Sequence, residues 1–322
     1  MNAPTLLAAK DRILGGLWGS LVGDALGVPV EFMDRASVQI NPVKSMRGFG
    51  THDQPPGTWS DDGSLILCTA ESLVEHEFDL DDLGAKFVRW ANRGLWTAWG
   101  EAFDIGVTTS DALHRITNGT PAAEAGGQDE YNNGNGSLMR IIPAVLRFAN
   151  DPIDQFADRL EQLSAITHGH ARSQLACVFY GLVTRHLLLG LPALSALQAA
   201  RLEFTARYEA NSSFPHFQPV LEDDLVGLRD YQINSSGYVL HTLRASLWCL
   251  LNTGDYRDCV LQAVNLGYDT DTTGCVAGGL AGVAYGFPSI PADWLGEMAR
   301  KDEVDALFAA FVARCEKSTT HA

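Results

Sequence analysis

Residues 62–76 read DGSLILCTAESLVEH. Apolar side chains recur there every three or four residues, and these side chains share one face of the helix that the spacing predicts: Leu65, Ile66, Thr69, Leu73 and Val74. The same periodicity runs through segments at 12–27, 80–92, 104–116, 137–149, 154–167, 170–189, 192–207, 237–252, 255–265, 271–285 and 302–315. Because strand-like alternation is scarce, the sequence predicts an all-α fold, a compact multi-helix orthogonal bundle of roughly ten or more helices.

The composition is that of a folded, acidic protein. Of the 322 residues, 46% are hydrophobic and 19% are charged, which disfavours disorder. Asp and Glu number 39 against 23 Lys and Arg, so the net charge is −16. A net-acidic surface repels the phosphates of nucleic acids and of anionic lipids. We therefore expect no nucleic acid and no membrane among the general partners.

The cysteines indicate the compartment. All six lie outside any Cys-x-x-Cys pair, and most lie in apolar stretches. This pattern favours buried free thiols in a reducing environment. No run approaches about 18 uninterrupted apolar residues, so no membrane helix is expected. The N-terminus also lacks the basic region and clean apolar core of a secretory signal, and the cytoplasm is therefore the expected location.

Three segments interrupt the helical pattern. Residues 41–60 are rich in Gly and Pro, 118–136 are polar and Gly-rich, and 208–236 form a long polar excursion. Loops of this length tend to be functional or mobile. None resembles a linker between two self-sufficient halves, so we expect a single domain over residues 1–322.

The sequence contains no Walker A loop, GxSxG or HExxH, and no GxGxxG follows a strand pattern. P-loop hydrolysis, serine-hydrolase chemistry, zinc proteolysis and Rossmann redox chemistry are disfavoured.

Two acidic clusters stand at predicted helix starts. One is Ser-Asp-Asp at 60–62, and the other is Asp-Thr-Asp-Thr-Thr at 269–273. Helix capping accounts for either cluster taken alone. However, each offers two carboxylates and a neighbouring hydroxyl, the oxygen donors that suit a hard divalent cation. Four carboxylates brought together without a metal would repel one another strongly. The pair therefore favours Mg²⁺ or Mn²⁺, which accept all-oxygen ligation, over zinc or copper.

Four further features carry weaker signals. The Gly-rich run 133–137 is expected to lead into the helix and to suit a phosphate, or else to be an ordinary turn with a Ser cap. In Thr167-His168-Gly169-His170, between two predicted helices, a histidine is expected as a cap or a hydrogen-bonded surface residue. Asp104 lies at a predicted helix start, where it would be an N-cap. Asp24 and Glu31 lie in a Gly-rich apolar stretch and need partners if buried.

Several segments together resemble the ADP-ribosylglycohydrolase family, which includes dinitrogenase reductase-activating glycohydrolase. The resemblance spans about residues 12–286 and rests on these segments, in this order: GSLVGDALGVPVEF, GTWSDDGSLILCTAESL, FDIG, NGNGSLMRIIP, THGHARSQLAC, SSGYVLHTLRASLWCLL and LGYDTDTTGCVAGGLAG. It implies a compact all-α fold and a centre of two divalent cations, Mg²⁺ or Mn²⁺. The implied metal ligands are Ser60, Asp61, Asp62, Asp269, Asp271 and Thr272. Many members have Thr at the position of Ser60, and either residue supplies a hydroxyl.

The resemblance also implies the residues that meet the substrate. Besides Asp62, the catalytic carboxylates would be Glu31, which matches the family's glutamate near the metals, and Asp104, which resembles an acidic residue of members that act on ADP-ribosylated arginine. The implied substrate-binding residues are Asn135, Gly136 and Ser137 for phosphate and ribose, His168 for ribose, and Tyr238 near the nucleotide. Tyr268 stands where relatives often have a small or acidic residue, so the pocket shape is expected to differ. Residues 205–236 match nothing and would form a variable insertion.

The implied function is removal of mono-ADP-ribose from arginine by hydrolysis of the N-glycosidic bond. This reaction would reverse an ADP-ribosylation, either to reactivate an enzyme or to protect the cell from a toxin. The expected partners are then an ADP-ribosylated protein, ADP-ribose and an ADP-ribosyltransferase toxin. Two alternatives remain open. One is a related hydrolase for serine-linked or free ADP-ribose derivatives, and the other is a non-catalytic protein that binds ADP-ribose or blocks a toxin.

Overall fold

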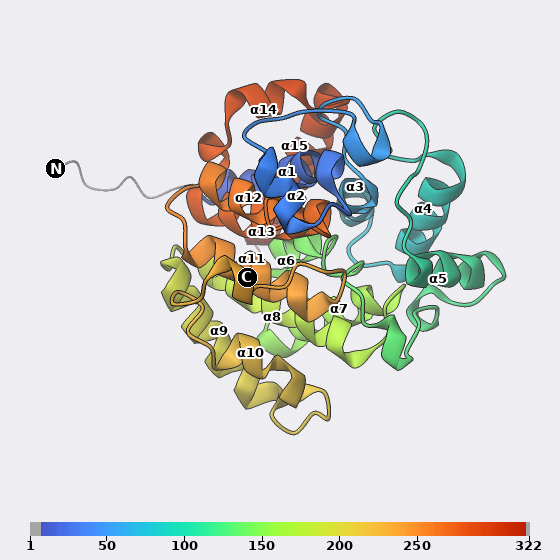
Figure 1. Ribbon diagram of the computed structural model, residues 1–322. Coiled ribbons are helices and arrows are strands. Elements are labelled where there is room, and N and C mark those ends of the chain that lie inside the picture. The colour runs from blue at the N-terminus through green and yellow to red at the C-terminus, as the bar shows by residue number, and fades with distance from the viewer. Residues whose placement is uncertain (1–7, 320–322) are drawn as a thin grey trace.

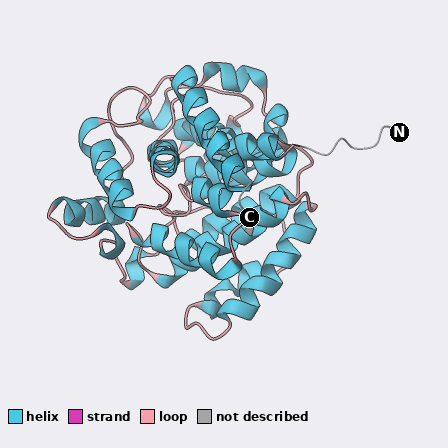
Figure 2. Ribbon diagram, turned by 180° about the vertical axis from the view of Figure 1, so that it is seen from behind, coloured by secondary structure: helices cyan, strands magenta, loops and turns pink. Residues whose placement is uncertain are grey.

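The computed structural model describes residues 8–319 and confirms the all-α prediction. Within these residues, strand-type pairing is limited to three isolated bridges (Figure 2). The α-helices are α1 (Ala9–Gly27), α2 (Arg35–Ile40), α3 (Asp61–Glu75), α4 (Leu80–Arg93), α5 (Val107–Thr117), α6 (Ile142–Phe148), α7 (Ile153–Ala165), α8 (Ala171–Leu188), α9 (Ala193–Tyr208), α10 (Gln218–Leu221), α11 (Val239–Leu251), α12 (Tyr256–Val264), α13 (Thr270–Tyr285), α14 (Ala292–Glu297) and α15 (Lys301–Thr319).

Two predicted helices begin later than their periodicity indicated. The helix predicted at 104–116 begins at Val107, because Asp104 has a left-handed φ of 58° that a helix cannot contain. The helix predicted at 137–149 begins at Ile142, and residues 136–140 form turns. Pro143 explains this second difference, since proline is tolerated in the first turn of a helix but not in its interior. The short helices α2, α10 and α14 had no periodic signal long enough to predict them.

Helices α1 and α13 lie against each other at the centre of the fold (Figure 1). Glycines line the contact on both helices. A Cβ atom added at Gly278 would lie 2.2 Å from the carbonyl oxygen of Gly19, and one at Gly23 would lie 2.1 Å from that of Gly274. Such distances mean that the two backbones touch, with no room for side chains between them. The pairing runs antiparallel, so the end of α1 meets the start of α13.

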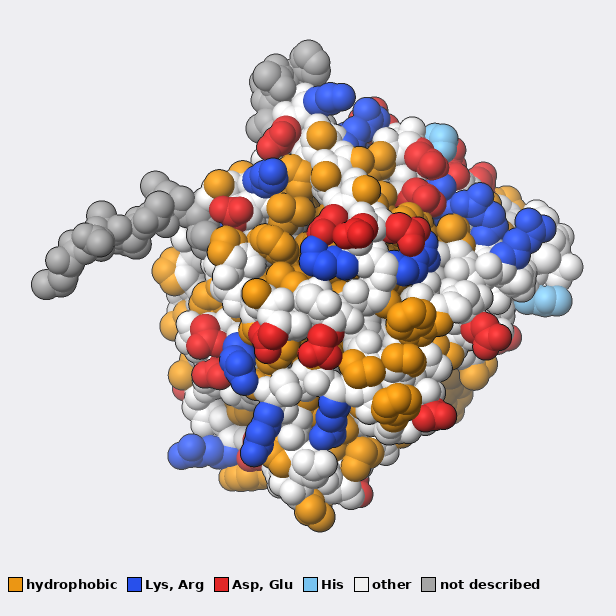
Figure 3. Space-filling view, turned by 90° about the horizontal axis from the view of Figure 1, so that it is seen from above, with side chains coloured by type: hydrophobic (Ala, Val, Ile, Leu, Met, Phe, Trp, Pro, Cys, Tyr) orange, Lys and Arg blue, Asp and Glu red, His pale blue; other side chains and the backbone are white. Residues whose placement is uncertain are grey.

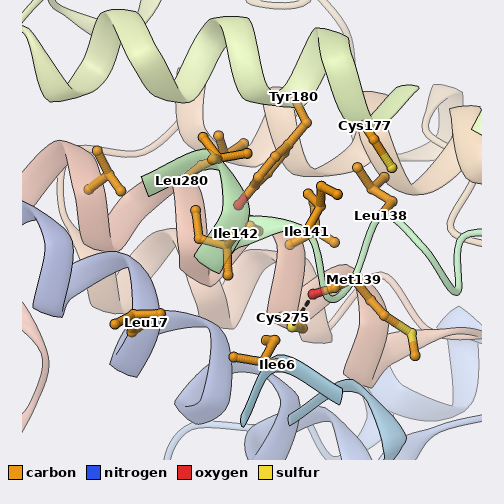
Figure 4. Packing of buried hydrophobic residues seen from close by; sticks show 14 of the residues in the cluster. Leu17, Ile66, Leu138, Met139, Ile141, Ile142, Cys177, Tyr180, Cys275 and Leu280 are labelled. Carbon is orange, nitrogen blue, oxygen red and sulfur yellow. Dashed lines mark hydrogen bonds between the residues drawn. The ribbon is translucent and has the colours of Figure 1, made fainter. Parts of the chain in front are cut away.

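The remaining helices bury apolar side chains around this pair. Leu17 on α1 is fully buried, as are Leu280 and Cys275 on α13. Figure 4 shows them packed with residues of α3, α6 and α8, and the thiol of Cys275 donates to the Met139 carbonyl at 3.5 Å. All six cysteines are buried and none forms a disulfide, as the sequence predicts.

The segment Ala9–Val30 is long and apolar enough to cross a membrane, but 89% of its most apolar window is buried inside the protein. Burial on all sides is the pattern of a core helix.

On the face of the protein viewed from above, acidic and basic side chains are interspersed and do not gather into patches of one sign (Figure 3).

The predicted insertion at 205–236 holds the end of α9, the short α10 and several turns. It packs against α11, where Arg244 pairs with Asp223 and the Trp248 indole donates to the Leu228 carbonyl at 3.1 Å. Its variation among relatives stays a prediction.

The contact between α1 and α13 predicts a strong effect of Gly278→Ala. The added methyl group would overlap the Gly19 carbonyl, and we expect the free energy of unfolding to fall by about 3 kcal/mol or more, because overpacking against backbone cannot be relieved by a side-chain rotation. Gly296→Ala on α14 is the matched control, since nothing lies within 4 Å of its added Cβ. Urea unfolding measures both variants. If Gly278→Ala were as stable as Gly296→Ala, a direct backbone contact between α1 and α13 would be contradicted.

Candidate active site

The C-terminal half of α1 and the starts of α3 and α13 meet at one end of the glycine contact. Asp24 on α1 is fully buried and accepts hydrogen bonds from the backbone N–H groups of Ser60, at 3.1 Å, and Gly63, at 2.8 Å. The Ser60 hydroxyl donates to the same carboxylate at 3.0 Å. A neighbouring helix thus satisfies the first N–H groups of α3, and Asp24 has the partners that its burial requires.

Capping accounts for only part of the two acidic clusters. Ser60 is the N-cap of α3, and its hydroxyl accepts from the Asp62 N–H at 3.3 Å, which confirms capping there. Asp269 is the N-cap of α13, but its carboxylate makes no capping bond. One of its oxygens accepts from the amide of Asn135 at 2.8 Å. The carboxylates at these two helix starts therefore have another role.

At these two helix starts, three buried carboxylate oxygens lack a hydrogen-bond partner among the described residues: Asp62 Oδ1, Asp269 Oδ1 and Asp271 Oδ2. All three belong to residues that the sequence predicts as metal ligands. A buried polar atom without a partner is costly. Oxygens that are buried together, charged and unpaired fit a bound cation, which would compensate them.

The carboxylates form two groups that share one residue. Oxygens of Asp61, Asp62 and Asp271 lie within 4.8 Å of one another, and so do oxygens of Glu31, Asp269 and Asp271. Asp271 thus stands between two adjacent positions, each of which could hold one metal ion.

Two hydroxyl groups complete the predicted ligand set. Those of Ser60 and Thr272 each lie 3.4 Å from Oδ2 of Asp62. Carboxylate and hydroxyl oxygens form the donor set that hard divalent cations prefer.

The electrostatics point the same way. Burial raises the pKa of Asp61, Asp62 and Asp271 well above the usual range, and repulsion from neighbouring carboxylates adds to the effect. Burial also raises the pKa of Glu31 to about 8. Within residues 8–319, the only ion pair to these groups is that between His52 and Glu31. Added positive charge is what would keep them ionised at neutral pH.

A pocket of about 320 Å³ opens over this cluster. Of the predicted catalytic and metal-binding residues, it is lined by the acidic Glu31, Asp61, Asp104 and Asp269 and by Thr272. Of the predicted substrate-binding residues, it is lined by Asn135, Gly136 and His168. Ser60, Asp62 and Asp271 are buried and do not line it.

Two predicted substrate-binding residues also lie outside the lining. The Ser137 hydroxyl is fully buried against that of Ser164, at 2.8 Å. The Tyr238 ring packs edge-on against His241, with the ring centroids 5.1 Å apart. Contact of either residue with a substrate stays a prediction.

Two local expectations about site residues are wrong, and a third holds for one histidine of two. Asp104 does not cap a helix, since Gly106 is the N-cap of α5. His170 caps α8, as expected of a histidine in this segment, whereas His168 is 3% exposed and is neither a cap nor a surface residue. The run 133–137 does not lead directly into α6, which begins at Ile142, so no helix N-terminus lies there to attract a phosphate.

Sequence reasoning missed His52. Its Nε2 lies 2.5 Å from a carboxylate oxygen of Glu31, and both groups lie within 4.8 Å of Asp104. The hydrogen bond to Glu31 raises the pKa of His52. The only available signal was its position in the long loop at 41–60, because a single histidine in a loop has no spacing to interpret.

The family model for ADP-ribosylglycohydrolase matches residues 5–320. The chain belongs to the ADP-ribosylglycohydrolase family. Over 320 residues it is 32% identical to the ADP-ribosylarginine hydrolase Tri1 of Serratia proteamaculans, covering 95% of this chain and 81% of the relative. It is 33% identical to the ADP-ribosyl-[dinitrogen reductase] glycohydrolase of Rhodospirillum rubrum, covering 96% and 98%.

A solved structure agrees with these relatives. It is described as an ADP-ribosylglycohydrolase-related protein complex and superposes with a TM-score of 0.81 at 33% identity, covering 95% of this chain and 99% of that one. The resemblance seen in the sequence motifs is thereby confirmed, together with the fold that an ADP-ribosylglycohydrolase implies.

The shared carboxylate predicts how cations affect stability. Adding Mg²⁺ or Mn²⁺ to protein treated with EDTA should raise the melting temperature, because an ion that binds only the folded state stabilises it. Asp271→Asn should largely remove this rise. It should not lower the melting temperature of the metal-free protein, since the amide replaces a carboxyl group whose ionisation is disfavoured by burial and by the neighbouring carboxylates.

Differential scanning calorimetry with and without each cation measures these effects. Asp293→Asn is the control, because Asp293 is exposed on α14 and distant from the acidic cluster in sequence. A cation-dependent rise of wild-type size in Asp271→Asn would contradict a binding site around Asp271.

Proposed function

We propose that the protein is a metal-dependent hydrolase that removes mono-ADP-ribose from arginine side chains of modified proteins. The observation that carries the proposal is the pair of carboxylate groups sharing Asp271, with buried unpaired oxygens, beneath a pocket of an ADP-ribosylglycohydrolase. The arginine linkage is supported by the 32% identity to an ADP-ribosylarginine hydrolase. The acidic pocket lining supports it as well, because a guanidinium leaving group is basic.

Six residues would act as ligands of the metal ions. Two divalent cations, Mg²⁺ or Mn²⁺, would be held by Ser60, Asp61, Asp62, Asp269, Asp271 and Thr272. When bound, they would orient the ribose hydroxyls and make a water more acidic. Asp62 is buried behind the pocket lining. A ligand role therefore suits it better than direct proton transfer with substrate.

Glu31 is the carboxylate best placed to accept a proton from the attacking water. It lines the pocket and belongs to one of the two acidic groups. A general base must lie within hydrogen-bond reach of the proton that it accepts, and this position offers that reach. His52, bonded to Glu31 at 2.5 Å, holds the carboxylate in place. Negative charge around the pocket also stabilises the positive charge that develops on the anomeric carbon as the glycosidic bond breaks.

Asp104 is assigned to the arginine side of the bond. It lines the pocket next to Val107 and Thr108, and one of its carboxylate oxygens lies within 4.8 Å of a carboxylate oxygen of Glu31 and of a ring nitrogen of His52. A carboxylate there can accept two parallel N–H bonds from a guanidinium and hold the leaving group in line. Its left-handed backbone, with φ at 58°, is the kind of strain that persists when a site requires a particular side-chain direction.

The activity would serve either of two roles in the cytoplasm, which stays the expected location. It would restore an enzyme inactivated by ADP-ribosylation, or it would protect the cell from an ADP-ribosyltransferase toxin. Both roles use the same reaction and the same substrate linkage.

A hydrolysis assay on an arginine-ADP-ribosylated protein tests the metal requirement. We expect release of ADP-ribose with Mg²⁺ or Mn²⁺, and a loss of about a thousandfold or more with EDTA or in Asp271→Ala, because the cluster no longer supplies its cations. Asp293→Ala is the control and should retain wild-type turnover. Full turnover in EDTA would contradict the dinuclear mechanism. If the wild-type protein released no ADP-ribose, the non-catalytic alternative would remain.

The variant Asp104→Asn tests the acceptor. It should lower kcat/KM for the arginine-linked substrate by about a hundredfold or more, since the charged bond to the leaving guanidinium is lost. Binding of free ADP-ribose, measured by calorimetry, should change little. Wild-type activity in Asp104→Asn, or faster cleavage of a serine-linked substrate by the unaltered protein, would move the assignment to the alternative acceptor.

A further inference from the structure

His168 enters the pocket with one edge of its ring tied to the interior. Its Nδ1 lies 2.8 Å from the hydroxyl oxygen of Thr167, which is fully buried. The opposite edge faces the Gly-rich loop of the pocket. A Cβ added at Gly136 would lie 3.2 Å from Nε2, and one at Gly134 would lie 3.5 Å from it. The absence of side chains at these two positions leaves Nε2 room to meet a ligand.

A buried arginine lies behind the threonine. The side chain of Arg140 is fully buried, and its Nη2 donates to the Thr167 hydroxyl oxygen at 2.7 Å. The guanidinium stacks over the Phe87 ring, 4.6 Å from the centroid. Among the described residues, no carboxylate forms an ion pair with Arg140, and its Nε and Nη1 atoms have no hydrogen-bond partner. A buried cation with so few partners is costly to keep, and packing alone gives no reason for a charge at this position.

The donors and acceptors available on Arg140, Thr167 and His168 determine the direction of each hydrogen bond between them. Arginine has only donors, so the Thr167 oxygen must accept from it. The hydroxyl has one proton, and the described residues offer it His168 Nδ1 as acceptor. With a proton on Nδ1 instead, the buried hydroxyl proton would face another donor and lose its bond, which is unfavourable for a buried polar group. The neutral ring therefore carries its proton on Nε2.

We propose that Arg140 and Thr167 are positioning residues that fix His168 as an Nε2–H donor directed into the pocket. A donor at this point suits an acceptor oxygen, either a hydroxyl or a phosphate of ADP-ribose, and this part rests on the proposed function. The same arrangement keeps the ring neutral, because burial first and the nearby Arg140 second lower the pKa of His168 to about 3. The donor is then present throughout the physiological pH range.

Two variants of Thr167 separate the hydroxyl from the packing. Thr167→Val keeps the shape of the side chain and removes the hydroxyl, whereas Thr167→Ser keeps the hydroxyl. Thr184→Val is the matched control, because Thr184 is also fully buried and donates to a backbone carbonyl, that of Tyr180, at 2.8 Å. It lies near the other end of α8 from His168.

The first readout is the tautomer of His168 in the full-length, Mg²⁺-loaded protein without ADP-ribose. Long-range ¹H–¹⁵N correlation of the histidine rings reports it, with His168→Gln used to assign the signal. We expect Nε2–H in the wild type, Thr167→Ser and Thr184→Val, and a mixture of tautomers in Thr167→Val. An Nδ1–H ring in the wild type overturns the proposal, and that spectrum decides the matter even if Thr167→Val fails to fold.

The second readout is the affinity for ADP-ribose by calorimetry. Thr167→Val should bind about tenfold more weakly, the effect of one hydrogen bond, and Thr167→Ser should restore binding to within about threefold. An unchanged affinity and tautomer in Thr167→Val, or an equal loss in Thr184→Val, would overturn the positioning role. A wild-type protein that binds no ADP-ribose would contradict the proposed function instead, while the tautomer measurement still decides the hydrogen-bond direction.

Discussion

The antiparallel contact between the glycine faces of α1 and α13 is the constraint on which the site depends. Because a Cβ at Gly278 or Gly23 would overlap the opposite backbone, the two helices approach more closely than side chains normally allow. The contact brings the C-terminal half of α1 against the first turn of α13. Asp24 then reaches the N-terminus of α3, and the acidic starts of α3 and α13 come to face the same space.

This arrangement concentrates negative charge where the fold can least tolerate it. The carboxylates of Asp61, Asp62 and Asp271 are buried together, and the described residues place no lysine or arginine among them. Charge buried in this way destabilises a folded protein unless something compensates it. The packing of the core helices offsets that destabilisation, and a bound cation would reduce the destabilisation further by compensating the charge.

The pocket combines two electrostatic environments. Its lining includes the carboxylates of Glu31, Asp61 and Asp104, which suit cations and a basic leaving group. The lining also includes His168, which contacts Thr167 and, through it, the buried Arg140. The proposed substrate, with an anionic diphosphate and a cationic acceptor, would use both. The net negative charge of the chain therefore does not predict the hydrogen-bond donor that we propose at His168.

The sequence by itself determined the helical class, the two acidic clusters and the family, because each is written in residues close together along the chain. Helical periodicity and the Ser-Asp-Asp and Asp-Thr-Asp-Thr motifs are local patterns. Only the tertiary structure decided that Asp62 lies behind the pocket, that Ser137 turns away from it, and that His52 bonds Glu31. These relations depend on which backbone segments pack together, and no spacing along a single chain encodes a contact between helices that are more than two hundred residues apart.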